Sequence, residues 1–187
     1  MEKKKIGLFA GSLRKESFSR KIANNIVKMA PESFDFKIVE IGQLPFFNQD
    51  FDDYNSDPES YIAFRKEVAE LDGFIFVTPE YNRSLPAVLK NALDVASRPY
   101  GHNVWSGKPG AVISCSIGGI GGFGANHHLR QVLSYLEVYT MQQPEAYLGN
   151  ITTDLFDENG NFTTERTYKF VKTFVDAYVA WFEQVTQ

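Results

Sequence analysis

Three short segments carry the residue types that suit binding of a charged, flat ligand. Residues 11–20, 78–86 and 116–124 each follow a short apolar run and combine glycine or proline with hydroxyl, guanidinium or amide groups. Backbone N–H groups and side chains of these types bind anions and the polar edges of ring systems. The chemistry that they indicate is cofactor binding rather than acid–base or nucleophilic catalysis.

The first segment predicts a phosphate site. It offers Ser12, Ser17 and Ser19 as hydroxyl donors and Arg14 and Arg20 as guanidinium donors, just before a predicted helix. Free N–H groups at a helix N-terminus and arginine side chains both bind phosphate. The segment contains neither a G-x-x-x-x-G-K-[ST] nor a G-x-G-x-x-G pattern, so we expect a terminal monophosphate. The alternative is a serine-capped helix with solvated arginines.

The second segment predicts a wall for a flat ring. Pro79 and Tyr81 can form its apolar surface, while the backbone from Glu80 to Asn82 and the Asn82 amide can address a polar ring edge. A rigid turn into a helix is the alternative interpretation.

The third segment is rich in glycine and starts at Ser116. Because Gly118 and Gly119 have no side chain, a ligand can approach the main chain closely there. The unobstructed N–H groups are donors that can stabilise the negative charge which a flavin develops on reduction. The alternative is a mobile loop that tolerates glycine. A phosphate site, a ring wall and a glycine-rich floor together indicate flavin mononucleotide (FMN) better than any of them alone.

Five short apolar runs, separated by segments of helical periodicity, position these loops. Such runs predict strands that are covered on both faces, as in a doubly wound parallel α/β sheet. Ligands bind beyond the carboxyl ends of these strands, which is where the three segments stand. At 187 residues the chain predicts one domain, residues 1–187. The predicted strands are residues 6–10, 36–41, 73–77, 110–115 and 138–141.

Helices are expected between and after the strands. The first follows Ser19, the third follows Ser84 as its N-cap, and the fourth starts near Ala125. The second covers residues 60–71, the last covers residues 164–184, and polar loops are expected at residues 49–60 and 152–161.

The chain resembles the NADPH-dependent FMN reductase family of flavodoxin-like proteins, which includes quinone, azo-dye and chromate reductases. The resemblance extends over nearly the whole chain. It is carried by Gly-Ser-Leu-Arg from Gly11, Pro-Glu-Tyr-Asn from Pro79, Leu-Lys-Asn-Ala-Leu-Asp from Leu89, His-Leu-Arg from His128 and Pro-Glu from Pro144. It implies a three-layer sandwich with a five-stranded parallel sheet in the order 2-1-3-4-5.

The resemblance also assigns residues to the cofactor. The residues implied around the FMN phosphate are Ser12, Arg14, Ser17, Phe18 and Ser19. Pro79, Glu80, Tyr81 and Asn82 are implied to line the isoalloxazine ring, with Ser116 and Gly119 closing its other side, and Gly118 belongs to the same expected site.

The implied activity is an FMN-dependent oxidoreductase that passes electrons from NADPH or NADH to a small acceptor by a ping-pong mechanism. The chemistry belongs to FMN N5, so no catalytic side chain is expected. The acceptor can be a quinone, a flavin, an azo compound or a metal oxyanion. Family members are dimers or tetramers, often through the helix that here follows Ser84, so a homodimer or homotetramer is expected.

Two other functions stay open. One is a flavodoxin-type FMN carrier that does not oxidise nicotinamide, although such carriers are more often strongly acidic. The other is a sensory protein that has kept the fold without the chemistry.

Composition excludes several partners. A net charge of −4 argues against nucleic acid, and the apolar run at residues 6–10 is too short to cross a membrane. The single cysteine, Cys115, has no disulfide partner, which predicts a cytoplasmic protein. His127 and His128 are adjacent on a predicted helix and do not share a face, so we expect no metal site.

Overall fold

The protein is described over residues 2–187 by a computed structural model. Within that range six strands form one parallel sheet in the order β2-β1-β3-β4-β5, and β6 also pairs with β4. The strands are β1 (Lys4–Ala10), β2 (Phe34–Ile38), β3 (Gly73–Pro79), β4 (Pro109–Cys115), β5 (Tyr139–Thr140) and β6 (Ala146–Leu148). The predicted α/β class and the strand order 2-1-3-4-5 are confirmed.

The fifth position of the sheet is shared by two short strands. β5 pairs with the start of β4, at Pro109 and Gly110, and β6 pairs with its end, from Ile113 to Cys115. The single strand predicted at residues 138–141 is therefore shorter than expected and has a second strand after it. Between the two strands stands Pro144, which has no N–H group to donate to a ladder.

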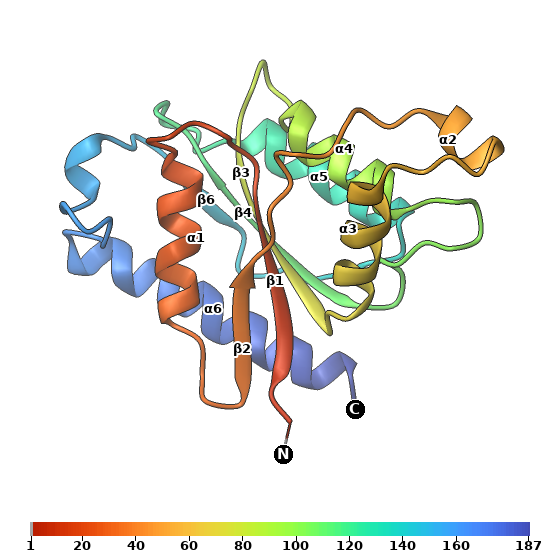
Figure 1. Cartoon of the computed structure of the whole chain (residues 1–187). Coiled ribbons are helices and arrows are strands. Elements are labelled where there is room, and N and C mark those ends of the chain that lie inside the picture. The colour runs from red at the N-terminus through yellow and green to blue at the C-terminus, as the bar shows by residue number, and fades with distance from the viewer. Residues whose placement is uncertain (1) are drawn as a thin grey trace.

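Helices cover both faces of this sheet (Figure 1). α1 (Phe18–Lys28) and α6 (Glu165–Val185) pack on one face, while α3 (Glu59–Ala69), α4 (Ala87–Ala96) and α5 (Phe123–Tyr135) pack on the other. Among the described residues, no helix combines the length and the apolar character needed to cross a bilayer.

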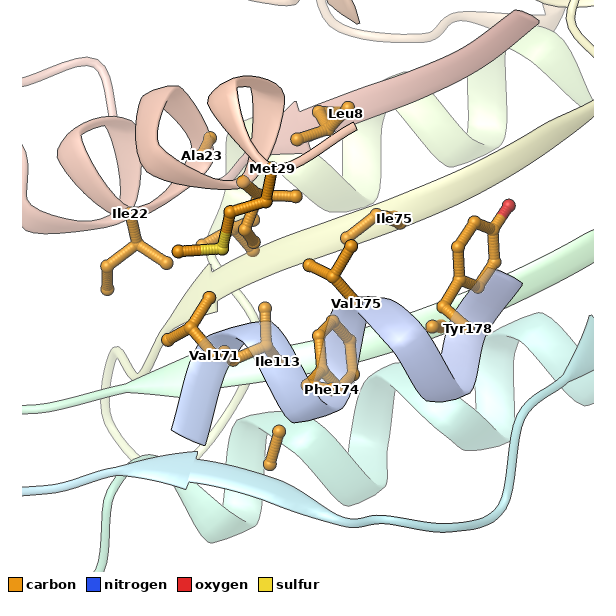
Figure 2. Close-up of a cluster of buried hydrophobic side chains, with 14 of the residues drawn as sticks. Leu8, Ile22, Ala23, Met29, Ile75, Ile113, Val171, Phe174, Val175 and Tyr178 are labelled. Carbon is orange, nitrogen blue, oxygen red and sulfur yellow. The ribbon is translucent and has the colours of Figure 1, made fainter. Parts of the chain in front are cut away.

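Alternate residues of the central strands supply the two cores. Leu8 points into the core under α1 and α6, and the next residue, Phe9, points into the core under α3, α4 and α5. Figure 2 shows side chains of this first core, among them Leu8, Ile75 and Ile113 of the strands and Phe174 of α6. All four side chains are buried, and each such burial contributes about 1.5–3 kcal/mol to folding.

Two predicted loops contain short helices. α2 (Gln49–Asp53) lies in the loop predicted at residues 49–60, and a 3₁₀ turn (Thr153–Leu155) lies in the one at residues 152–161. The Asn48 side chain accepts the N–H of Asp50 and so caps α2. An asparagine just before the predicted loop is thus a helix-capping residue.

Helix starts differ from the predictions by a few residues. α1 is capped by Ser17 rather than Ser19, and α4 begins after Pro86 rather than Ser84. Proline suits that boundary because its fixed φ and missing N–H cost nothing there. Thr164 caps α6, in agreement with the predicted start of the last helix.

Candidate functional site

The carboxyl ends of the three central strands meet at one edge of the sheet. Ala10 of β1 is in register with Val77 of β3, and Pro79 of β3 is in register with Cys115 of β4. The loops that follow these strands lie together along the upper edge of the sheet in Figure 1. The three segments that the sequence singled out are therefore neighbours in space.

These loops enclose a pocket of about 190 Å³. It is lined by Ser12, Arg14, Ser17, Phe18, Ser19, Pro79, Glu80, Tyr81, Cys115, Ser116 and Ile117. Of the residues expected at the cofactor, only Asn82, Gly118 and Gly119 lie outside this lining, although they belong to the same loops. Cys115 and Ile117 line the pocket in addition.

The first loop places two buried hydroxyls at the start of α1. Ser17 Oγ accepts the N–H of Arg20 at 3.1 Å and lies 3.0 Å from Ser19 Oγ. The ring of Phe18, between them in sequence, stacks on Phe156 with 5.9 Å between centroids. The helix cap and the aromatic stack hold both serines at the pocket.

The two arginines of this loop have different surroundings. Arg20 forms a bidentate ion pair with Glu40, which lowers the pKa of the Glu40 carboxyl. Arg14 lines the pocket, is exposed, and forms no ion pair with any of residues 2–187. Arg14 is thus the guanidinium available to a ligand. Three serine hydroxyls and one arginine form a donor set that fits a phosphate dianion.

The second loop is a tight two-residue turn. Tyr81 and Ser84 exchange backbone hydrogen bonds, each 3.0 Å long. The turn residues between them, Asn82 and Arg83, have φ values of 50° and 67°. This is the geometry of a type I′ turn, which accepts asparagine more readily than most residues. Tyr81 stays 48% exposed beside the pocket, so it can face a flat ring.

Glu80 does not present its carboxylate to solvent. Its side chain is 10% exposed. Oε2 accepts the N–H of Ala125 on α5 at 3.1 Å, and Oε1 accepts from Arg83 at 3.2 Å. Ser84, predicted as a helix cap, instead has its Oγ 3.0 Å from His128 Nδ1. Both side chains join the turn to α5.

The glycine-rich loop is held by backbone hydrogen bonds. Ser116 donates to Leu148 at 2.9 Å and accepts from Ile151 at 3.1 Å, and Gly118 accepts from Asn150 at 3.2 Å. A Cβ on Gly149 would stand only 2.5 Å from the Gly119 carbonyl oxygen. These contacts favour a fixed floor over the mobile loop that the sequence left open.

A buried polar network lies under this floor, and the sequence analysis missed it. Ser114 Oγ donates to the Gly121 carbonyl at 2.8 Å and accepts from Asn126 Nδ2 at 3.3 Å. Both side chains are fully buried. A serine within an otherwise apolar strand was the available signal, because a buried hydroxyl needs a partner.

Cys115 lines the pocket but is a protonated thiol. It is 2% exposed, and burial raises the pKa of the Cys115 thiol to about 12. A thiol with that pKa carries essentially no thiolate near neutral pH, so it is a poor nucleophile.

A second recess adjoins the pocket. Its volume is about 420 Å³, and it shares Arg14 and Tyr81 with the pocket. Leu13, Ala87 and Val88 make much of its wall apolar. The site thus combines an anion-binding end, a ring wall, a backbone floor and an adjoining apolar recess.

Comparisons with known proteins agree with this chemistry. The family model described as NADPH-dependent FMN reductase matches residues 4–153. A quinone reductase of Pseudomonas putida is 51% identical, over 94% of this chain and 93% of its own length. A 2-hydroxy-1,4-benzoquinone reductase of Burkholderia sp is 49% identical, over 95% of each chain.

The structure also resembles a solved flavoenzyme. FerB, an NAD(P)H:(acceptor) oxidoreductase of Paracoccus denitrificans, aligns with a TM-score of 0.89 and 39% identity, over 97% of this chain and 98% of its own. The match is to a reductase over nearly its whole length. The chain therefore belongs to the NADPH-dependent FMN reductase family, which makes it an FMN-dependent NAD(P)H oxidoreductase, as the sequence predicted.

Proposed function

We propose that this protein reduces quinones with NAD(P)H, through an FMN bound where the three loops meet. The observation that carries the proposal is the single pocket that unites Ser17, Arg14, Tyr81 and Ser116. The phosphate would lie at the start of α1. The isoalloxazine ring would lie against Pro79–Asn82, with Ser116, Gly118 and Gly119 on its other side.

In this proposal the protein's own residues bind FMN and orient it. FMN supplies the chemistry, by accepting hydride at N5 and giving up electrons. No side chain at the pocket is arranged as a general acid or nucleophile. The Glu80 carboxylate is occupied by Ala125 and Arg83, and the Cys115 thiol stays protonated because its pKa is raised to about 12.

The adjoining recess supports an apolar, planar acceptor. Leu13 is 61% exposed there, and Ala87 and Val88 of α4 face the same space. A quinone ring can bury its faces on such a surface, whereas a metal oxyanion needs several charged donors. The relatives in Pseudomonas putida and Burkholderia sp are named for quinone and 2-hydroxy-1,4-benzoquinone reduction.

An anaerobic experiment tests the donor and the order of steps. The full chain is loaded with FMN, freed of excess and mixed with NADPH or NADH in a stopped-flow instrument. We expect rapid bleaching near 450 nm, recovery of the colour on adding a benzoquinone, and parallel double-reciprocal plots. Colour that is retained but does not bleach would identify an electron carrier instead, and intersecting plots would contradict the ping-pong order.

A panel of acceptors tests the substrate class. Benzoquinones, an azo dye, free FMN and chromate are compared by kcat/KM at fixed NADPH. The proposal expects the largest value for a quinone. A larger value for chromate would contradict the apolar recess as the acceptor site.

We also propose a homo-oligomer that uses α4 and α5. A recess of about 770 Å³ lies between the carboxyl-terminal parts of these helices. Tyr100 and Tyr135 at its rim are 89% and 86% exposed. Exposed aromatic side chains beside a groove are typical of interfaces. Mass measurement distinguishes a dimer from a tetramer.

We further propose a single domain and a cytoplasmic location. The single sheet with helices on both faces supports one domain over residues 1–187. A single, buried Cys115 without an internal disulfide partner and the use of NAD(P)H support a cytoplasmic protein.

A further inference from the structure

Glu80 has a role that neither the sequence motif nor the family assignment explains. It follows Pro79 at the end of β3, yet its carboxylate is directed to a different element, α5. Its Oε2 atom accepts the N–H of Ala125 in the first turn of that helix at 3.1 Å. N–H groups of a first turn have no acceptor within the helix, and α5 has no side-chain cap at Gly122. A residue of the ring wall therefore caps the helix that follows the glycine-rich floor.

Close packing accompanies this hydrogen bond. A Cβ added to Gly124 would lie 2.7 Å from the Arg83 carbonyl oxygen and 2.9 Å from Glu80 Oε2. Only glycine lets the turn approach α5 so closely. Ser84 Oγ and His128 Nδ1, 3.0 Å apart, add a contact one helical turn further along.

The conformation of the turn needs such support. Asn82 and Arg83 both have left-handed backbone angles, which asparagine tolerates but which are unfavourable for arginine. The Tyr81–Ser84 backbone pair closes the turn, but it does not fix the direction in which the turn points. The contacts of Glu80, Arg83 and Ser84 with α5 do fix that direction.

We propose that Glu80 is a positioning residue, which holds the ring wall at Pro79–Asn82 in a set relation to the glycine-rich floor by capping α5. The proposal rests on the proposed FMN site, because it assigns a consequence for flavin binding. Glu80 takes no proton from substrate in this role. It acts through Ala125 and through the backbone of the turn.

Two variants and a control test the role. Glu80→Ala removes the cap, while Glu80→Gln keeps an amide oxygen that can accept from Ala125. Asp52→Ala is the matched control, since the Asp52 side chain is 9% exposed, close to the 10% of Glu80, and is likewise paired with an arginine. Asp52 belongs to α2 and does not line the flavin pocket.

The first measurement does not depend on FMN. Amide hydrogen exchange of Ser84 and Ala125 is followed by NMR in the full chain without cofactor. We expect exchange to be about tenfold faster or more in Glu80→Ala, because a charge-assisted hydrogen bond is lost. Glu80→Gln should lie between that variant and the wild type. Asp52→Ala should leave both amides unchanged even where it lowers the melting temperature.

The second measurement is flavin affinity. Glu80→Ala should weaken FMN and riboflavin binding by the same factor, about tenfold, because the ring contact and not the phosphate contact is displaced. Its visible circular dichroism should differ from that of the wild type, and Glu80→Gln should restore much of both properties. A purely structural role would lower the melting temperature and leave the spectrum of the bound flavin unchanged.

The outcomes separate the two proposals. Unchanged amide exchange in Glu80→Ala, or flavin affinity and dichroism equal to those of the wild type, would overturn the positioning role and leave the proposed function standing. A wild-type chain that binds no flavin would overturn the proposed function. In that case amide exchange alone would still decide whether Glu80 fixes the turn.

Discussion

Ser17 Oγ and Ser19 Oγ lie 3.0 Å apart and are both buried at the start of α1, but only Ser17 caps the helix. Both hydroxyls thus lie at the pocket, but only the Ser17 hydroxyl also stabilises the helix. Ser17→Ala should weaken FMN binding and also lower the free energy of unfolding by about 1 kcal/mol, through loss of the cap. Ser19→Ala should weaken FMN binding alone. Urea denaturation and fluorescence titration check the pair, and equal stability of the two variants would contradict this division.

Arg14 should contribute to binding of the phosphate and not of the ring. Arg14→Ala should weaken FMN affinity by about tenfold to a hundredfold, since a charge-assisted hydrogen bond is worth about 1.5–3 kcal/mol. Riboflavin, which has no phosphate, should bind both proteins equally. Arg20→Ala is the matched control, because the Arg20 guanidinium is paired with Glu40. An equal effect of the two arginine variants on FMN affinity would place the phosphate elsewhere.

Cys115 predicts a particular dependence of stability on pH. Burial raises the pKa of its thiol from 9.0 to about 12, so the folded chain keeps a proton that the unfolded chain loses. Between these values the unfolded state binds fewer protons, and the free energy of unfolding falls as pH rises. Below pH 9 the contribution of the protonated thiol to the free energy of unfolding is fully present.

The comparison with Cys115→Ala isolates this effect from other titrating groups. From pH 8 to pH 10 the wild type should lose about 1 kcal/mol more stability than Cys115→Ala. Urea denaturation at both pH values measures the difference. NAD(P)H oxidation by Cys115→Ala at pH 7.5 should equal that of the wild type, and a large loss there would give the thiol a redox role.

The proposed oligomer predicts the effect of a charge at the exposed aromatic rim of the α4–α5 recess. Tyr135→Glu should increase the share of monomers, because it removes a large aromatic side chain from the proposed contact and adds a charge whose burial costs free energy. Tyr168→Glu on α6, where the tyrosine is 47% exposed, is the control and should leave the mass unchanged. Light scattering after size-exclusion chromatography gives the masses. If Tyr135→Glu is still an oligomer, the interface lies on another face of the protein.

The positions of the strands could be predicted from local sequence because they depend on strong local signals. Runs such as Phe74–Val77 are apolar on both faces, as a covered parallel strand requires, and they stand at the spacing of crossover helices. The family resemblance then supplied the order 2-1-3-4-5. The pocket-lining residues followed from the same logic, because loops at the carboxyl edge of a parallel sheet come together.

Contacts between distant parts of the chain were beyond that reasoning. Arg14 and Arg20 are equivalent in the sequence, and only the folded chain brings Glu40, in the loop after β2, to Arg20. Glu80 was expected near the ring edge, and nothing local indicated that Ala125, 45 residues later, takes its carboxylate. The polar loop before α3 formed α2 because Asn48 acts as a cap, a role that asparagine shares with turn formation.

The edges of the sheet also bear on how this protein behaves when it is concentrated. One edge is β2, five residues long, whose Asp35 and Lys37 are exposed, and the other is divided between β5 and β6. A strand from a second molecule needs a long, flat and unbroken edge to add to. Neither edge offers one, so self-association through strand addition is disfavoured. Copies of the chain would then associate through helix faces, where the contacts can be specific and the assembly has a fixed number of copies.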